Sequence, residues 1–154
     1  MKCRPILTLT RTDEYDRLVK FFVENELEFD GDEEVDTDIV QCFKMVDPAD
    51  NLIAAAVLAK REGEYIIDGI AVDPAFRKFG LGKVLLEKLK SEVKRLGGDS
   101  IAIVARAPEF FRKNDFDRVN PDSAPNFFEC KQCPQYLKNC FPEVMRLKID
   151  KVNN

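Results

Sequence analysis

The chain has 154 residues, of which 45% are hydrophobic and 34% charged, and its formal net charge at neutral pH is −4. This composition predicts a soluble globular protein with a core of normal size, and the acidic balance argues against nucleic acid as a general partner. The chain contains no histidine, which excludes catalytic Ser-His and Cys-His pairs and every histidine-ligated metal site.

The N-terminal sequence and the cysteines bear on where the protein works. No apolar run approaches the length of a membrane span, and the charged start Met1-Lys2-Cys3-Arg4 is not followed by the apolar core of a signal peptide. The five cysteines are an odd number, so reduced thiols are expected rather than a disulfide framework. Both observations predict a cytoplasmic protein without a membrane partner.

A strand and an amphipathic helix are predicted first. Residues Arg4–Leu9 alternate as in a strand, and Thr12 is the expected N-cap of the next helix, with acidic residues in its first turn. Apolar side chains then recur on one helical face, at Tyr15, Leu18, Val19, Phe22 and Val23.

The segment Glu24–Asp38 that follows carries nine acidic residues and no basic one. Such a charge run is usually a solvated connection between two elements. It would also attract a cationic molecule through its negative potential, and the sequence leaves both interpretations open.

Three strands in an antiparallel meander are predicted for the middle of the chain. Ile39–Val46 and Leu52–Lys60 are rich in apolar residues and flank the turn 47–51, whose Asp, Pro and Asn residues suit a hairpin. Glu62-Gly63 then turns the chain into the strand Glu64–Val72.

A long helix is predicted after this strand. Asp73-Pro74 ends the strand because proline cannot continue a ladder. Gly97-Gly98 ends the helix. Between them an apolar stripe recurs at helical spacing, formed by Leu81, Leu85, Leu89, Val93 and Leu96 and widened by Val84 and Leu86.

Two glycines, Gly80 and Gly82, lie where the strand gives way to this helix. Glycines at such a junction can serve packing alone, or they can let the backbone approach a ligand closely or take a positive φ. A helix N-terminus favours an anion through its unpaired amide groups and its dipole. The same point is surrounded by three cationic side chains, Arg77, Lys78 and Lys83, so a phosphate site is predicted here.

The residues from Val72 to Gly82 resemble the signature V-x-P-x-x-R-x-x-G-x-G of the GNAT superfamily of acyl-CoA-dependent N-acyltransferases. They match neither the P-loop pattern nor the dinucleotide fingerprint. The resemblance implies acetyl-CoA as acyl donor, its pyrophosphate bound at the turn and its pantetheine arm along the edge of the preceding strand. The CoA-binding residues it implies are Ile70, Ala71, Val72, Arg77, Lys78, Phe79, Gly80, Leu81, Gly82 and Lys83.

A second motif follows the strand Ser100–Ala105, which we expect to run parallel to Glu64–Val72 through a right-handed crossover. Residues Ala107–Phe116 resemble the GNAT pattern A-x-x-F-Y-x-K-x-G-F with two departures. Asp115 replaces the glycine, and aspartate tolerates left-handed φ. Phe111 replaces the tyrosine whose hydroxyl in many relatives protonates the departing CoA thiolate; it keeps its place at the CoA site but cannot donate that proton.

The last two predicted strands are Phe116–Val119 and Val144–Ile149. The fold class is therefore α+β: a GNAT-like, mixed and mostly antiparallel central sheet of about six to seven strands flanked by helices, with the fourth and fifth strands parallel and splayed. Residues 1–154 are expected to form a single domain.

Three cysteines lie within the segment 120–142 between these strands. Cys130, Cys133 and Cys140 have the spacing C-x-x-C-x₆-C. A zinc or iron–sulfur site would need a fourth ligand, and Cys130 with Cys133 would suit a redox pair. Cysteines also serve as small apolar residues, and no metal is expected.

The implied reaction is direct transfer of an acetyl group from acetyl-CoA to a primary amine. It needs a donor to the developing oxyanion, assigned to a backbone N–H near Ile70–Val72, and a base for the ammonium proton. Asp68 is a candidate base, because many relatives carry a glutamate at this position, but it would equally serve as a polar contact between strands. Glu64 is a weaker candidate.

Two alternatives belong to other classes. One is a non-catalytic acyl-CoA-binding module, and the other is a cysteine-centred metal or redox protein on a GNAT scaffold. The sequence leaves the acceptor and the oligomeric state open, although homodimers are common in the superfamily.

Overall fold

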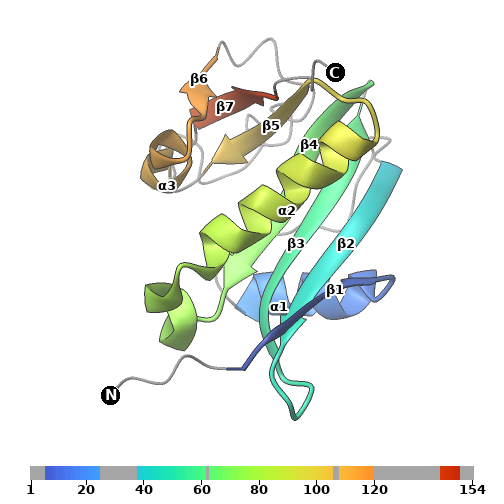
Figure 1. Ribbon diagram of the computed structural model, residues 1–154, viewed down its shortest axis with the longest axis vertical. Coiled ribbons are helices and arrows are strands. Elements are labelled where there is room, and N and C mark those ends of the chain that lie inside the picture. Colours follow the sequence, from blue (N-terminus) through green and yellow to red (C-terminus); the bar gives the residue numbers. More distant parts are fainter. Residues whose placement is uncertain (1–5, 25–37, 62, 106–107, 120–142, 150–154) are drawn as a thin grey trace. The chain divides into compact units, whose positions relative to one another are not determined.

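The computed structural model describes residues 6–24, 38–61, 63–105, 108–119 and 143–149 (Figure 1). The elements in chain order are β1 (Thr8–Thr12), α1 (Tyr15–Glu24), β2 (Asp38–Val46), β3 (Leu52–Arg61), β4 (Glu64–Val72), the 3-10 helix η1 (Pro74–Phe79), α2 (Leu81–Arg95), β5 (Ser100–Ala105), α3 (Pro108–Lys113), β6 (Asp117–Arg118) and β7 (Glu143–Lys148). The strands form one sheet in the order β1-β2-β3-β4-β5-β7-β6, in which β4 and β5 are parallel.

The predicted α+β fold, a mixed sheet flanked by helices, is confirmed, while the splay of β4 and β5 stays a prediction. The chain divides into two compact units, Met1–Ala59 with Ile67–Leu89, and Lys60–Ile66 with Lys90–Asn154. Strand β4 and helix α2 contribute residues to both units, and the expected single domain stays a prediction. No helix within the described ranges is long and apolar enough to cross a membrane.

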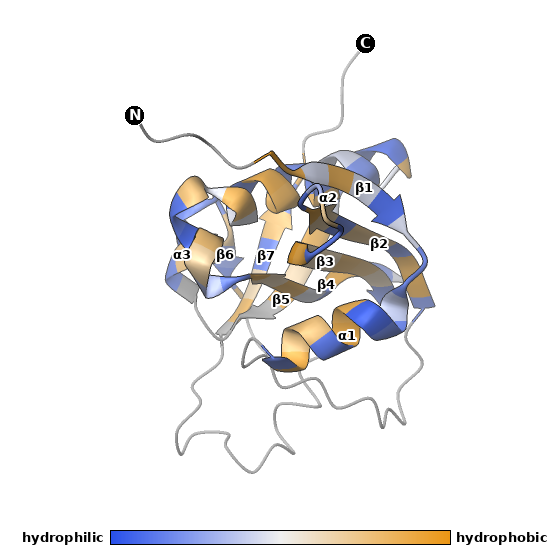
Figure 2. Cartoon of the chain, turned by 90° about the horizontal axis from the view of Figure 1, so that it is seen from below, coloured by the Kyte–Doolittle hydropathy of each residue, from blue (hydrophilic) through white to orange (hydrophobic). Residues whose placement is uncertain are grey.

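In the first unit, strand β3 is the most deeply buried element. Every residue from Ile53 to Ala59 is buried, which indicates that both faces of the strand are covered. Helix α1 covers one face, and the start of α2 covers the other (Figures 1 and 2). The core under α1 consists of Leu18, Phe21, Phe22, Cys42, Ala55 and Val57.

Hydrophobic and hydrophilic segments alternate along α1 in Figure 2, as a helix with one apolar face requires. The predicted face is largely correct, but the structure buries Phe21 and leaves Val23 55% exposed. Helix α2 buries Leu81, Leu85, Leu86 and Leu89 of the predicted stripe within the first unit and leaves Val84 46% exposed.

The predicted start of α1 is wrong by a few residues. The expected strand Arg4–Leu9 is instead β1 at Thr8–Thr12, which pairs with β2 from Thr8 opposite Val46 to Thr12 opposite Cys42. This ladder keeps Thr12 in the sheet, so α1 begins at Tyr15. The Thr12 hydroxyl still accepts the Glu14 N–H, at 3.1 Å.

In the second unit, β5 pairs with β7 along its whole length, from Ser100 opposite Lys148 to Ala105 opposite Glu143. The predicted end of α2 at Gly97-Gly98 is confirmed. Gly97 has φ 84°, its N–H donates to the Lys94 carbonyl, and the Gly98 N–H donates to the Val93 carbonyl. This is the paired hydrogen bonding of a Schellman cap, and it leaves Leu96 39% exposed.

Candidate active site

The junction between β4 and α2 contains a capped 3-10 helix, η1, that was not predicted from the sequence. The Asp73 carboxylate accepts the Ala75 N–H at 2.9 Å and so caps η1. The 3-10 helix ends at Gly80, whose φ is 70°. Helix α2 begins at the next residue, Leu81. Of the two predicted glycines, Gly80 takes a positive φ, whereas Gly82 is the second residue of the helix.

The charges around this junction favour an anion. Arg77, Lys78 and Lys83 are exposed, and the first turn of α2 contains no acidic residue. The Arg77 Nε donates to the Val72 carbonyl at 3.3 Å, which links η1 to the end of β4. Cationic side chains therefore surround the positive end of a 15-residue helix, where first-turn amides have no partner within the helix itself. Such an arrangement can bind a phosphate or pyrophosphate.

The end of β4 is half-buried at Ile70, Ala71 and Val72. On one side it is tied to β3, because the Asp73 N–H donates to the Ile53 carbonyl at 2.8 Å. Ala71 packs against the apolar core under α1.

The predicted base, Asp68, contacts helix α1. The Tyr15 hydroxyl donates to the Asp68 Oδ2 at 3.3 Å, and both side chains are half-buried. The next residue, Gly69, also approaches α1, because a Cβ added there would lie 2.5 Å from the Phe22 Cε2. Two neighbouring residues of β4, Asp68 through its carboxylate and Gly69 through its backbone, thus lie against α1.

Cys42 of β2 lies near Asp68 and is 3% exposed. Burial and, secondarily, the negative charges of Asp68 and Asp13 raise the pKa of the Cys42 thiol from 9.0 to about 11. A thiol with this pKa stays protonated at neutral pH, so it does not serve as a nucleophile.

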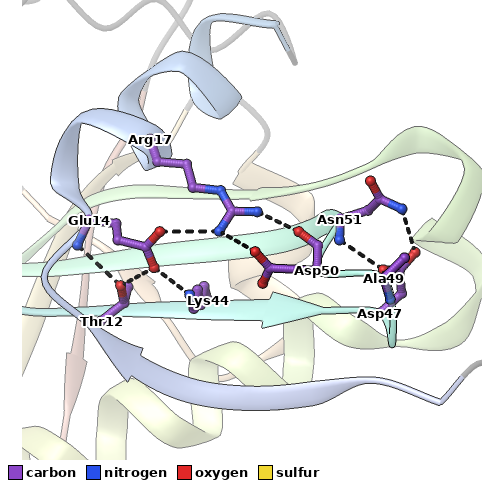
Figure 3. A network of polar contacts seen from close by, with 8 residues as sticks. All are labelled: Thr12, Glu14, Arg17, Lys44, Asp47, Ala49, Asp50 and Asn51. Atoms are coloured by element: carbon purple, nitrogen blue, oxygen red, sulfur yellow. Dashed lines mark hydrogen bonds and ion pairs between the residues drawn. The ribbon is translucent and has the colours of Figure 1, made fainter.

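A polar network fixes the chain just before Tyr15 (Figure 3). Glu14 accepts hydrogen bonds from Thr12 at 2.6 Å and Arg17 at 3.2 Å, and it forms an ion pair with Lys44 of β2. The Lys44, Thr12 and Arg17 contacts, in that order, lower the pKa of Glu14 to about 2. Arg17 continues the network to the Asp50 carbonyl at 2.6 Å, in the β2–β3 turn.

The weaker candidate base, Glu64, is already paired. Its Oε1 lies 2.8 Å from the Arg146 Nη2 of β7. Arg146 pairs with Ala102 of β5, and Ala102 pairs with Ile66 of β4. Ala102, on β5, therefore lies between β4 and β7, the two strands that the Glu64–Arg146 ion pair joins. The Glu64 carboxylate is thus already occupied by a hydrogen bond from arginine.

Phe111 is 5% exposed, in the second unit. Its ring makes edge-to-face contacts with Phe110 and Phe116, with centroids 5.1 and 5.4 Å apart. It is thus part of an aromatic core, and its role at the CoA site stays a prediction. The expected left-handed conformation of Asp115 is confirmed, because its φ is 72°.

The three cysteines of the C-terminal segment, Cys130, Cys133 and Cys140, lie outside the described residues. Within the ranges that the structure describes, no three His, Cys, Asp or Glu side chains are grouped so that they would hold a metal ion.

The sequence predicted Asp68 and the turn at Gly80, but it did not predict that Tyr15 and Cys42 lie beside Asp68. Tyr15 was visible as one residue of an apolar helical face, and its polar hydroxyl on that face was the one available signal. Cys42 had no signal, because it is an ordinary apolar position of a strand.

The mixed sheet, with its parallel β4–β5 pair and a cationic strand-to-helix junction, defines a protein of the α+β class. A family model described as "Acetyltransferase (GNAT) family" matches residues 8–116. The chain therefore belongs to the GNAT family of acetyltransferases. No curated protein sequence matches it significantly.

Solved structures share the fold at low sequence identity. A GNAT-family acetyltransferase from Staphylococcus aureus Mu50 is 16% identical, with a TM-score of 0.71 over 94% of this chain and 100% of that one. N-acetylglutamate synthase from Neisseria gonorrhoeae, complexed with coenzyme A and N-acetylglutamate, is 14% identical, with a TM-score of 0.70 over 97% of this chain and 36% of that one. A GNAT-family acetyltransferase from Elizabethkingia anophelis with acetyl-CoA bound is 16% identical, with a TM-score of 0.61 over 92% and 97%.

Proposed function

We propose that this protein transfers the acetyl group of acetyl-CoA directly to a primary amine. The observation that carries the proposal is the η1–α2 junction, where left-handed Gly80 leads into a helix whose first turn has cationic and no acidic neighbours. The CoA complexes of two similar structures support acetyl-CoA as donor. The backbone amides of Phe79 to Lys83 would bind the pyrophosphate, and the edge at Ile70–Val72 would pair with the pantetheine arm.

In the proposed reaction, Asp68 takes a proton from the ammonium group of the acceptor, and the amine nitrogen attacks the thioester carbonyl carbon. A backbone N–H near Ile70–Val72 stabilises the oxyanion. The carbon–sulfur bond then breaks, and CoA leaves as a thiolate, because Phe111 has no proton to give; the second proton of the amine nitrogen is released to water as the amide forms. Asp68 is preferred over Glu64 because Glu64 is held by Arg146.

The test is a screen of primary amines with acetyl-CoA, in which the free thiol of CoA is measured against a blank for the protein's own five cysteines. Thiol release that depends on the amine, together with the acetylated amine by mass spectrometry, would support the proposal. CoA affinity is measured in parallel by calorimetry. Failure to bind CoA would contradict the proposed site itself.

A non-catalytic acyl-CoA-binding module is the second candidate, and the buried Phe111 favours it because the residue offers no acid to a leaving thiolate. This candidate predicts CoA affinity without thiol release for any amine. A cysteine-centred metal or redox protein predicts zinc or iron bound to protein prepared anaerobically under reducing conditions, or a Cys130–Cys133 disulfide that forms on addition of an oxidant and is reversed by a reductant. We further propose a cytoplasmic location, without nucleic acid or membrane partners.

A further inference from the structure

The contact between Tyr15 and Asp68 joins residues 53 positions apart in the sequence. Tyr15 is the first residue of α1, and its ring packs against the apolar core under that helix. The packed ring fixes the direction of the hydroxyl, which donates to the Asp68 carboxylate at 3.3 Å. A tyrosine with a packed ring and a bound hydroxyl has little rotamer freedom left to lose.

Helix α1 is held against the sheet on both sides of this contact. Before Tyr15, Glu14 is bonded to Thr12 of β1 and to Lys44 of β2. After it, the fully buried Phe22 ring closes on Gly69, the residue next to Asp68. The helix is thus fixed at both ends relative to the strand that carries the candidate base.

We propose that Tyr15 is a positioning residue for Asp68. This inference rests on the proposed acetyl transfer, in which the Asp68 carboxylate accepts the ammonium proton. The half-buried carboxylate lies beside Gly69 on β4, and the Tyr15 hydroxyl holds it in one orientation. A base that is already held within hydrogen-bonding distance of the proton does not have to change its side-chain orientation during proton transfer.

The test is a double-mutant cycle on kcat with Tyr15→Phe, Asp68→Asn and both together. We expect Tyr15→Phe to lower kcat about tenfold, the effect of losing roughly one charge-assisted hydrogen bond. The KM for acetyl-CoA and the affinity for CoA should not change. In the Asp68→Asn background, Tyr15→Phe should have no further effect on kcat, because a positioning residue acts only through the group it positions.

Tyr65→Phe is the matched control, because it deletes a hydroxyl from a half-buried tyrosine whose ring lies beside Val93 and Gly98. Its kcat should equal that of the wild type. If the wild type acetylates an amine, two results would overturn the positioning role alone. One is a kcat of Tyr15→Phe equal to that of the wild type, and the other is a double variant whose loss of kcat is the product of the two single losses. CoA binding without turnover of any amine by the wild type would overturn the proposed function and, with it, this role.

Discussion

Among single residues, Gly80 can be substituted to test whether CoA binding depends on its conformation, separately from the stability of the fold. Its φ of 70° is left-handed, and among the described residues no atom beyond its own chain neighbours lies within 4 Å of the position that a Cβ would take. An alanine there would meet backbone strain of about 1 kcal/mol but no clash. Because the strain acts at the helix N-terminus, we expect Gly80→Ala to weaken CoA binding about tenfold by calorimetry.

Gly63 provides the control for this substitution. It has φ 82° and equally open surroundings, but it lies in the turn before β4. Gly63→Ala should therefore reduce the free energy of unfolding by a similar amount, about 1 kcal/mol, and leave the CoA affinity unchanged. Equal CoA affinities for the two variants would show that the geometry of Gly80 does not serve an anion.

The buried Cys42 predicts a loss of stability in alkaline solution. Its pKa is 9.0 when unperturbed and about 11 in the folded protein. Between these values the folded state keeps a proton that the unfolded state has released, so the free energy of unfolding falls as pH rises from 9 to 11. The contribution is fully present below pH 9, and its loss amounts to roughly 2–3 kcal/mol.

Denaturant unfolding at several pH values between 8 and 11 measures this loss. Tyrosine and lysine groups also titrate in this range, so the comparison is with Cys42→Ala. That variant starts less stable because of its cavity, but its stability should decline less steeply than that of the wild type. Parallel declines in the two proteins would contradict the assigned environment of Cys42.

At the scale of elements, the packing of α1 on β4 requires a glycine at position 69. A Cβ there would lie 2.5–2.9 Å from three atoms of the Phe22 ring, and Phe22 is fully buried. The ring cannot move aside without repacking the core, so Gly69→Ala should destabilise the protein by about 1–3 kcal/mol in denaturant unfolding.

A smaller side chain at position 22 should relieve this clash. Phe22→Leu alone leaves a cavity, but combined with Gly69→Ala it should cost less than the two single changes together. Gly98→Ala is the matched control, since its Cβ would meet Val93 and Tyr65 at 2.6–2.8 Å. Phe22→Leu should give Gly98→Ala no relief, and additive losses in both pairs would reject the proposed contact.

Elements with strong local signals were predicted well from the sequence. Strand Glu64–Val72 is confirmed residue for residue, and α2 begins at the predicted Leu81, because proline and glycine mark these boundaries locally. The start of α1 was misplaced because Thr12, the predicted N-cap, is the last residue of β1. It pairs there with Cys42 of β2, a strand that is distant in the sequence.

The candidate site was predictable in part for the same reason. The Gly80 turn is a contiguous motif, and Asp68 is a charge within an apolar strand. Tyr15, which donates a hydrogen bond to Asp68, and Cys42, whose pKa is raised in part by the charge of Asp68, come from other elements. Their pairing depends on how α1 lies on the sheet, which leaves no local pattern in the sequence.

At the scale of the whole molecule, the net charge conceals an uneven distribution. The chain has 28 acidic and 24 basic residues, and nine of the acidic ones lie in Glu24–Asp38. The rest of the chain therefore has 24 basic against 19 acidic residues. A polyanionic donor is attracted by basic residues, and a cationic amine by acidic ones. In this sequence the acidic residues are concentrated in Glu24–Asp38, and the rest of the chain has an excess of basic residues.

Most of this acidic segment lies outside the described residues. Converting Glu26, Glu28, Asp32 and Glu33 to their amides should raise the KM for a cationic amine several-fold at low salt, because the attraction to the carboxylates is reduced. The KM for acetyl-CoA should fall or stay constant, since the donor is an anion. At 1 M salt, where the Debye length is about 3 Å, the variant and the wild type should converge.

The matched control removes four exposed acidic charges elsewhere, at Glu87, Asp99, Glu109 and Asp117. It changes the net charge by the same amount, so any effect of net charge alone appears in both variants. A larger KM effect from the segment than from the control assigns the acceptor's attraction to Glu24–Asp38. Equal effects would show that the segment is only a solvated connection, because a local potential falls off within a Debye length, about 10 Å at 0.1 M salt.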